Sequence, residues 1–126
     1  MPETDERYYS GFEGESEYFF VVKKDGTELK RLGIWDGYMN DMLMKIEPTD
    51  EGWTGIMYYF HVGMFEDDHW TGDKMWQLDD LPLVYDQLSA AKGHMRYSET
   101  AEVLEAVLSL VKDAMENDEE VYIYEE

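Results

Sequence analysis

Residues 53–76 have the sequence WTGIMYYFHVGMFEDDHWTGDKMW, and we expect the fold and the chemistry of this chain to be organised around them. Residues 53–62 are apolar on both alternating faces, which is typical of a buried central strand. From residue 64 onward, carboxylates gather around His69 and the segment closes with further aromatic residues. We therefore predict that its first half belongs to the core and that its second half forms a surface contact loop.

The length and composition of the chain are those of one folded domain, residues 1–126. A chain of 126 residues with 44% hydrophobic side chains can close a hydrophobic core without disulfides or metal. No internal repeat or low-complexity linker divides it. Residues 1–7 are polar and offer little to bury, so we expect them to be flexible.

The charge of the chain is strongly negative. Thirty acidic and ten basic side chains give a formal net charge of -20. Such a surface repels nucleic acid phosphates and anionic membranes, and it attracts basic partners in a salt-dependent way. We therefore expect a basic protein partner and no direct contact with nucleic acid or membrane.

Three features bear on the compartment. The chain has no cysteine, which excludes disulfides and thiol catalysis and fits a reducing cytoplasm. Its first residues are acidic and polar where a secretory signal is basic and then apolar. No apolar run approaches the ~20 residues needed to cross a bilayer. We expect a soluble, cytoplasmic protein.

A β-hairpin is predicted in the first third of the chain. The run EYFFVVKK at residues 17–24 is rich in aromatic and β-branched side chains, and Asp25-Gly26 follows it at once. An Asp-Gly pair between two such runs indicates a tight turn, because both residues tolerate a positive φ. We expect the returning strand to cover residues 27–35, to be interrupted at Gly33 and to end at the next Asp-Gly pair.

The sequence YMNDMLMKIE at residues 38–47 fits two structures. Met42, Met44 and Ile46 alternate as in a strand, whereas the apolar residues from Met39 onward also recur at helical spacing. Turn signals on both sides leave only about ten residues between them, which favours the strand.

Two helices are predicted in the second half. The run DDLP at residues 79–82 is typical of a helix start, because an aspartate can cap and proline is tolerated in the first turn. Gly93 is placed to end this helix, and Ser98 or Thr100 is expected to cap a longer one. The longer helix has the clearest amphipathic stripe in the sequence, formed by Val103, Leu104, Val107, Leu108, Val111, Ala114 and Met115.

A short alternating strand, VYIYE, closes the chain at residues 121–125. Strands, then two helices, then a closing strand is an order typical of an α+β domain. We predict a mainly antiparallel sheet of about four to five strands, with the two helices packed on one face and the C-terminal strand joining the sheet.

A metal site is the first candidate chemistry, since Glu66, Asp67, Asp68, His69 and Asp73 offer hard oxygen ligands and one imidazole. The spacing of an EF-hand loop and a paired-histidine zinc motif are both absent from the sequence. In a chain with thirty carboxylates a local group of four is expected by chance. We therefore predict a solvated loop, with neither metal nor cofactor.

Catalysis is the second candidate. Paired carboxylates act as acid and base only in a concave site that separates their pKa values, and the sequence shows no such site. It also has no nucleophile elbow, P-loop or dinucleotide-binding turn. We predict a protein that is not an enzyme, and a small metal-dependent enzyme is the remaining alternative of this class.

A protein-binding surface is the third candidate. Four tryptophans and ten tyrosines exceed what a small core needs, and several lie beside carboxylates, as in Trp35-Asp36. Aromatic anchors rimmed by charge are typical of binding hot spots, and the charge steers the partner. The candidate contact residues are Glu66, Asp67, Asp68, Trp70, Asp73, Trp76, Glu99, Glu102 and Glu105.

In its general plan the chain resembles bacterial immunity proteins, which neutralise polymorphic or contact-dependent toxins. The resemblance lies in the acidic, aromatic composition, in WQLDDLPLVYDQLSAAKG at residues 76–93, and in the second helix with EEVYIYEE at residues 119–126. It implies tight binding to a toxin domain, often a basic nuclease, by occlusion of its active site. A phage-encoded inhibitor of the anti-restriction or anti-CRISPR kind, whose carboxylates imitate DNA phosphates, is the alternative. Both hypotheses predict affinity that falls as salt rises.

Overall fold

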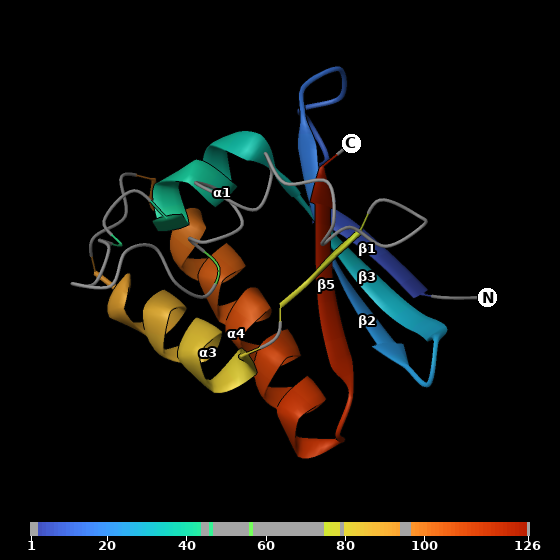
Figure 1. The fold of residues 1–126 in the computed structure, drawn as a ribbon. Coiled ribbons are helices and arrows are strands. Elements are labelled where there is room, and N and C mark those ends of the chain that lie inside the picture. Colours follow the sequence, from blue (N-terminus) through green and yellow to red (C-terminus); the bar gives the residue numbers. More distant parts are fainter. Residues whose placement is uncertain are drawn as a thin grey trace.

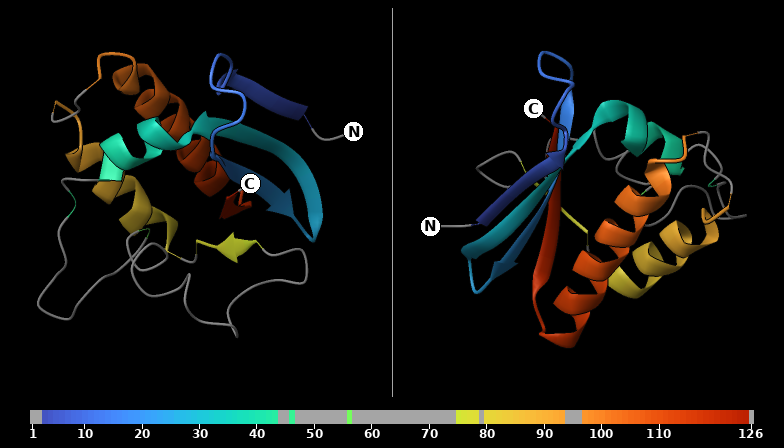
Figure 2. Two further views of the ribbon diagram at one scale, coloured as in Figure 1. Left: turned by 90° about the horizontal axis from the view of Figure 1, so that it is seen from above. Right: turned by 180° about the vertical axis from the view of Figure 1, so that it is seen from behind.

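A computed structural model of the chain describes residues 3–43, 46, 56, 75–78, 80–93 and 97–125. Its elements are β1 (Glu3–Tyr8), β2 (Glu17–Lys24), β3 (Thr27–Trp35), α1 (Asp36–Leu43), β4 (Trp76–Gln77), α3 (Leu81–Ala90), α4 (Thr100–Glu116) and β5 (Glu120–Glu125). The strands form one sheet in the order β1-β3-β2-β5-β4, and the helices lie on one face of it (Figure 1 and Figure 2). Because only β1 and β3 pair in parallel, the predicted α+β class with a mainly antiparallel sheet is confirmed.

The hairpin of β2 and β3 has the predicted bounds. Asp25 and Gly26 have φ values of 52° and 82°, so both adopt the left-handed conformation that a tight primed turn needs. Lys24 pairs with Thr27 directly across this turn. The Asp-Gly pair therefore forms the predicted turn, and beyond it the register of the hairpin shifts between Val22 and Lys23.

The prediction that Gly33 interrupts the second strand is wrong. β3 continues through Gly33, which pairs with Phe19 of β2. A Cβ atom at this position would overlap the Glu17 carboxylate and come within 2.9 Å of the Phe19 ring. Glycine is therefore required here for close approach of the β2 side chains, and not for a turn.

The N-terminal segment, for which the sequence predicts flexibility, forms strand β1. It pairs with β3 so that Thr4 lies opposite Arg31 and Asp5 lies opposite Leu32. An edge strand has only one neighbour, so a polar sequence suffices when one side chain reaches the core. Tyr8 is that side chain, with 9% of its surface exposed.

The segment after β3 is helical, so the strand favoured for residues 38–47 is wrong as far as the structure describes it. α1 buries Met39, Met42 and Leu43, which recur at helical spacing. Asp36 lies in its first turn, where a carboxylate is favourable at the positive end of the helix dipole. The Asp-Gly pair at this point therefore begins a helix instead of forming a turn.

The two predicted helices are α3 and α4. Asp80 caps α3 by accepting a first-turn backbone N–H at 3.1 Å, and Gly93 follows its end with a φ of 82°. The predicted cap of α4 is wrong, because neither Ser98 nor Thr100 supplies a side-chain capping bond. The predicted apolar stripe of α4 is buried, as shown by Val103, Leu104, Val107, Leu108, Val111 and Ala114, while Met115 is half-buried.

β5 is the predicted closing strand, and it lies between β2 and β4. Its side chains alternate between two apolar clusters. Val121 and Ile123 join the main core under the helices, whereas Tyr122 packs with Phe19 and Val21 on the opposite face. Both faces of the central strands are thus buried, which accounts for the aromatic and β-branched content of β2 and β5.

Most of the central strand predicted at residues 53–62 lies outside the described residues. Ile56 is the described position in this segment. It is fully buried, as expected of a core segment, but it is helical. Its backbone N–H donates to the Gln87 side chain of α3 at 3.1 Å. At this position the predicted burial is confirmed and the predicted strand is wrong.

Candidate functional site

Four aromatic side chains meet where β3 ends and α1 begins, and we call Phe12, Trp35, Tyr38 and Tyr97 the aromatic patch. The rings of Phe12 and Trp35 stack with centroids 4.0 Å apart and planes 5° from parallel. Tyr38 meets these two rings edge-on, at centroid distances of 5.7 and 5.1 Å. Tyr97 lies 6.0 Å from Trp35. Stacked and edge-to-face contacts of this kind hold the rings as one unit.

The local sequence explains why these rings meet. Trp35 is the last residue of β3 and Tyr38 lies in the first turn of α1, so the strand-to-helix junction brings them together. Phe12 belongs to the loop between β1 and β2, where the Tyr9 hydroxyl donates to the Glu15 carbonyl at 2.6 Å. Trp35 Nε1–H donates to the Glu15 carboxylate at 3.2 Å. This bond ties the loop to the junction.

Tyr97 is positioned by a buried carboxylate. Asp41 of α1 is 4% exposed, and it accepts the Tyr97 N–H at 2.9 Å and the Thr100 hydroxyl at 2.7 Å. Thr100 therefore uses its hydroxyl to bind α1 and not to cap α4. Since Asp41 connects α1 to the beginning of α4, it fixes the two parts of the chain that supply Tyr38 and Tyr97.

The aromatic patch is accessible from outside. Tyr97 is 37% exposed and, with Leu29, is one of the exposed large hydrophobic side chains in the described ranges. Phe12, Trp35 and Tyr38 are half-buried. Aromatic side chains that are fixed by their neighbours and still reachable are typical of protein-binding hot spots.

Carboxylates accompany the aromatic patch, and we call Glu13, Glu15, Asp36 and Glu99 the acid rim. Burial raises the pKa of Tyr38, and the charge of Glu99 raises it further, so the phenol stays neutral. The pKa of Glu13 is lowered because the Gly11 N–H donates to its carboxylate at 2.9 Å. The aromatic patch is thus an uncharged surface with carboxylates at its border.

The predicted contact loop lies outside the described residues, which applies to Glu66, Asp67, Asp68, Trp70 and Asp73. The prediction of Trp76 as an exposed anchor is wrong. Trp76 is 7% exposed, pairs with Ile123 and belongs to the main core. Alternate residues of a strand point to opposite faces, so polar sequence neighbours do not keep a tryptophan at the surface.

The predicted carboxylates of α4 are exposed but face different neighbours. Glu99 lies at the aromatic patch, as its effect on the pKa of Tyr38 shows. The pKa of the Arg7 guanidinium is raised chiefly by its hydrogen bonds to Asp5, and the charge of Glu102 adds to this. Glu105 pairs with Lys92 at 3.2 Å. Of the three, Glu99 alone joins the acid rim, whereas a cation accompanies each of Glu102 and Glu105.

Of the predicted contact residues, Glu99 belongs to the acid rim, whereas the four rings of the aromatic patch were not predicted as contact residues. The Trp35-Asp36 pair shows the predicted combination of an aromatic ring beside a carboxylate. Phe12 has the same signal, because glutamates follow it at positions 13 and 15. Tyr97 has no local signal, since the bond that positions it comes from Asp41, 56 residues earlier in the chain.

Comparison with protein-family models, with curated proteins and with solved structures finds no match to this chain. In the described part of the chain, no helix has both the length and the apolar composition needed to cross a bilayer. Over the same residues, no group of three or more His, Asp or Glu side chains could hold a metal ion. The function is therefore argued from the surface chemistry.

Proposed function

We propose that this protein is a binding protein of the immunity type, which contacts a basic protein through the aromatic patch and the acid rim. The observation that carries the proposal is that the four rings are fixed in place and still accessible, with Tyr97 37% exposed. Fixed rings lose little conformational entropy on binding, so their contacts contribute more of their energy to affinity. The carboxylates beside them favour a cationic partner.

The partner that we propose is a nucleic-acid-processing enzyme, such as a toxin nuclease, whose positive cleft this protein occludes. A cleft that binds phosphates is lined by arginine and lysine. Arginine stacks on aromatic faces and pairs with carboxylates, so the patch and the rim suit the same side chains. The net charge of -20 steers such a partner from a distance. A chain without cysteine supports the cytoplasmic location that we propose.

A DNA mimic of the phage-inhibitor kind needs carboxylates in rows that imitate phosphates. On α4, Glu99, Glu102 and Glu105 face three different neighbours, as described above. The arrangement of these residues therefore favours a localised aromatic interface over a long acidic one.

Affinity capture from the source organism tests the proposal. We expect the wild-type protein to retain a basic nucleic-acid-processing enzyme at low salt and to release it progressively as salt rises. The double variant Trp35→Ala with Tyr97→Ala should weaken binding by at least about 30-fold, because truncating a hot-spot aromatic costs ~2 kcal/mol or more. Leu29→Ala is the matched control, since Leu29 is also exposed but lies outside the patch.

Variants that neutralise carboxylates test whether the acid rim speeds association with the partner while the aromatic patch holds the complex together. Glu13→Gln, Glu15→Gln and Glu99→Gln together should slow association and leave dissociation nearly unchanged. The control removes the same three charges at exposed positions elsewhere, with Asp86→Asn, Glu105→Gln and Glu116→Gln. Equal association rates for the two triple variants, or an acidic partner retained at high salt, would contradict the proposed interface.

A further inference from the structure

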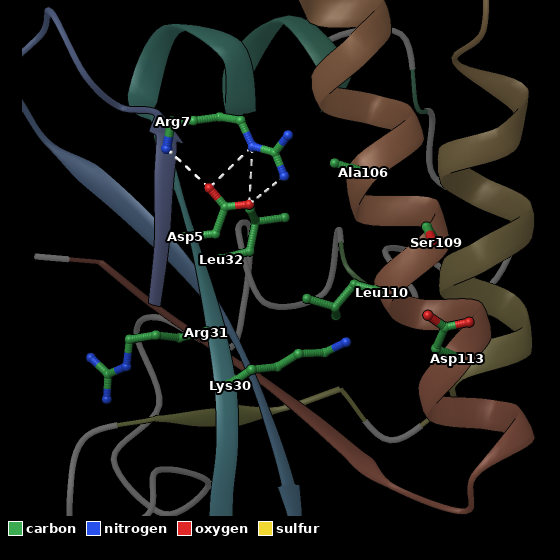
Figure 3. A pocket seen from close by; sticks show the side chains of 9 residues that line it. All are labelled: Asp5, Arg7, Lys30, Arg31, Leu32, Ala106, Ser109, Leu110 and Asp113. Carbon is green, nitrogen blue, oxygen red and sulfur yellow. Dashed lines mark hydrogen bonds and ion pairs between the residues drawn. The ribbon is translucent and has the colours of Figure 1, made fainter. Parts of the chain in front are cut away.

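A groove lies between α4 and the outer strands β1 and β3 (Figure 3). It has a volume of about 260 Å³. Leu32 of β3 forms its apolar floor, and Ala106 and Leu110 face this floor from α4. The volume is just below the range of roughly 300 to 1,000 Å³ that is typical of pockets for drug-sized ligands. The groove therefore suits a smaller molecule.

The groove gathers cations in a chain that has few of them. Arg7, Lys30 and Arg31 line it, and the whole sequence has ten basic side chains. Arg31 turns away from Lys30 in Figure 3 and pairs with Glu28 at 2.7 Å. Arg7 donates from Nε and Nη2 to the Asp5 carboxylate, at 3.1 and 2.7 Å. Arg31 is thus occupied elsewhere, and Arg7 is held by Asp5 at the other end of the groove from the Lys30 ammonium group.

Lys30 is the cation that the described groups leave uncompensated. Its side chain extends across the groove toward α4 (Figure 3). In the described part of the chain the Lys30 ammonium group forms no ion pair. Asp113 lies on the α4 wall, and it also forms none there. The groove therefore offers a positive group, a negative group and an apolar floor within one small volume.

We propose that this groove binds a free α-amino acid with an apolar side chain, in its zwitterionic form. The carboxylate of the ligand accepts from Lys30 Nζ, and its ammonium group donates to Asp113. Its side chain lies on Leu32 and Leu110. A simple carboxylic acid would leave Asp113 without a cation, and a simple amine would leave Lys30 without an anion, so the zwitterion matches both walls.

Three molecules that share the isobutyl side chain test this assignment: L-leucine, 4-methylpentanoate without the ammonium group, and 3-methylbutylamine without the carboxylate. Titration of the ¹⁵N-labelled protein is followed by NMR. We expect leucine to shift the amide resonances of Lys30, Leu32 and Leu110, and to bind about tenfold more tightly than either analogue, because each analogue loses one charge-assisted contact.

Two variants assign the charges. Lys30→Gln should weaken leucine binding about tenfold and remove its advantage over 3-methylbutylamine, whereas Asp113→Asn should remove its advantage over 4-methylpentanoate. Lys24→Gln and Asp86→Asn are matched controls, because both side chains are exposed and lie outside the groove. The spectra of all variants, recorded without ligand, report whether the fold is intact.

Several results would overturn the proposal. Leucine could leave the groove resonances unshifted, or 4-methylpentanoate could bind wild type as tightly as leucine does. Inorganic phosphate could displace leucine at lower concentration, which would make the groove an anion site of another class. Leucine affinity that is equal in Lys30→Gln and in Lys24→Gln would also contradict the assignment.

Discussion

The two sides of α4 present opposite chemistry. At its beginning, the aromatic patch is bordered by carboxylates and held by Asp41, a buried acceptor. Along its middle, the groove against β1 and β3 is lined by Arg7, Lys30 and Arg31. The protein keeps two of these scarce cations, Arg7 and Arg31, beside carboxylates of their own strands, Asp5 and Glu28. Among the described residues, local pairing along β1 and β3 thus leaves the negative charge at the border of the aromatic patch uncompensated, which suits the cationic partner that we propose.

The largest loss of stability is expected at the buried apolar stripe of α4, because this stripe supports both the aromatic patch and the groove. Leu104 is 1% exposed and lies in the stripe that packs α4 on the sheet. Leu104→Ala should lower the free energy of unfolding by roughly 2 to 5 kcal/mol, because it removes buried contacts and leaves a cavity. Urea unfolding measures this loss. The exposed neighbour Glu105→Ala is the control, and an equal loss in both variants would mean that α4 is not anchored by its stripe.

A smaller loss of stability is expected when Asp41 is substituted, and of the two proposed binding sites only the aromatic patch should be affected. Asp41→Ala leaves the Thr100 hydroxyl and the Tyr97 N–H without their acceptor, which should lower the free energy of unfolding by about 2 kcal/mol. Partner binding should weaken as well, because Tyr97 is no longer fixed. Leucine binding in the groove should stay within twofold of wild type. Loss of both binding activities together would contradict the separation of the two sides.

Much of this fold is predictable because its signals are local. The hairpin follows from Asp25-Gly26 between two β-rich runs, and α4 follows from a stripe that is continuous in sequence. α1 is not predicted, because the pattern of residues 38–47 fits a strand and a helix and the short distance between turn signals favours the strand. Tertiary contacts favour the helix, because it places Met39, Met42 and Leu43 together in the core.

The candidate site was less predictable than the fold. Trp76 shows why, because its polar sequence neighbours indicate exposure, whereas its pairing with β5 buries it. Tyr97 shows the converse, since its fixed position depends on Asp41 across a long sequence separation. A sequence pattern records which residues are adjacent in the chain, and both outcomes depend on residues adjacent only in space.

On the groove side, the Asp5–Arg7 ion pair is expected to contribute a small, pH-dependent effect. The pKa of Asp5 is lowered, chiefly by its hydrogen bonds from the Arg7 side chain. A lowered folded-state pKa means that the stabilisation is present above the unfolded value of ~3.9 and is lost as pH falls through the folded value. Asp5→Asn should therefore lower the free energy of unfolding by less than ~1 kcal/mol at pH 7, since the pair is partly exposed.

The check is urea unfolding of wild type and Asp5→Asn at neutral pH and again in acid well below pH 4. The difference between the two proteins should shrink in acid, where the wild-type carboxyl is protonated. Asp86→Asn is the control, since Asp86 is exposed on α3. A difference that persists unchanged in acid would assign the effect of Asp5→Asn to packing and not to the ion pair.

The smallest expected effect is a change in the pKa of one tyrosine on each side of α4, Tyr38 at the aromatic patch and Tyr8 on β1. Burial is the larger cause of the raised pKa of Tyr38, and the charge of Glu99 adds to it. Burial likewise raises the pKa of Tyr8, and there Glu102 contributes instead. Glu99→Gln should therefore lower the pKa of Tyr38 slightly, while burial keeps it above its ordinary value, and it should leave the pKa of Tyr8 unchanged. Glu102→Gln should lower the pKa of Tyr8 slightly and leave that of Tyr38 unchanged.

NMR of the two tyrosine rings across alkaline pH measures the two pKa values separately. Glu99 precedes α4 and Glu102 lies in its first turn. If each substitution changes the pKa of one tyrosine only, the two glutamates act on different sides of α4. Equal changes in both tyrosines would mean that the two sides share one acidic surface.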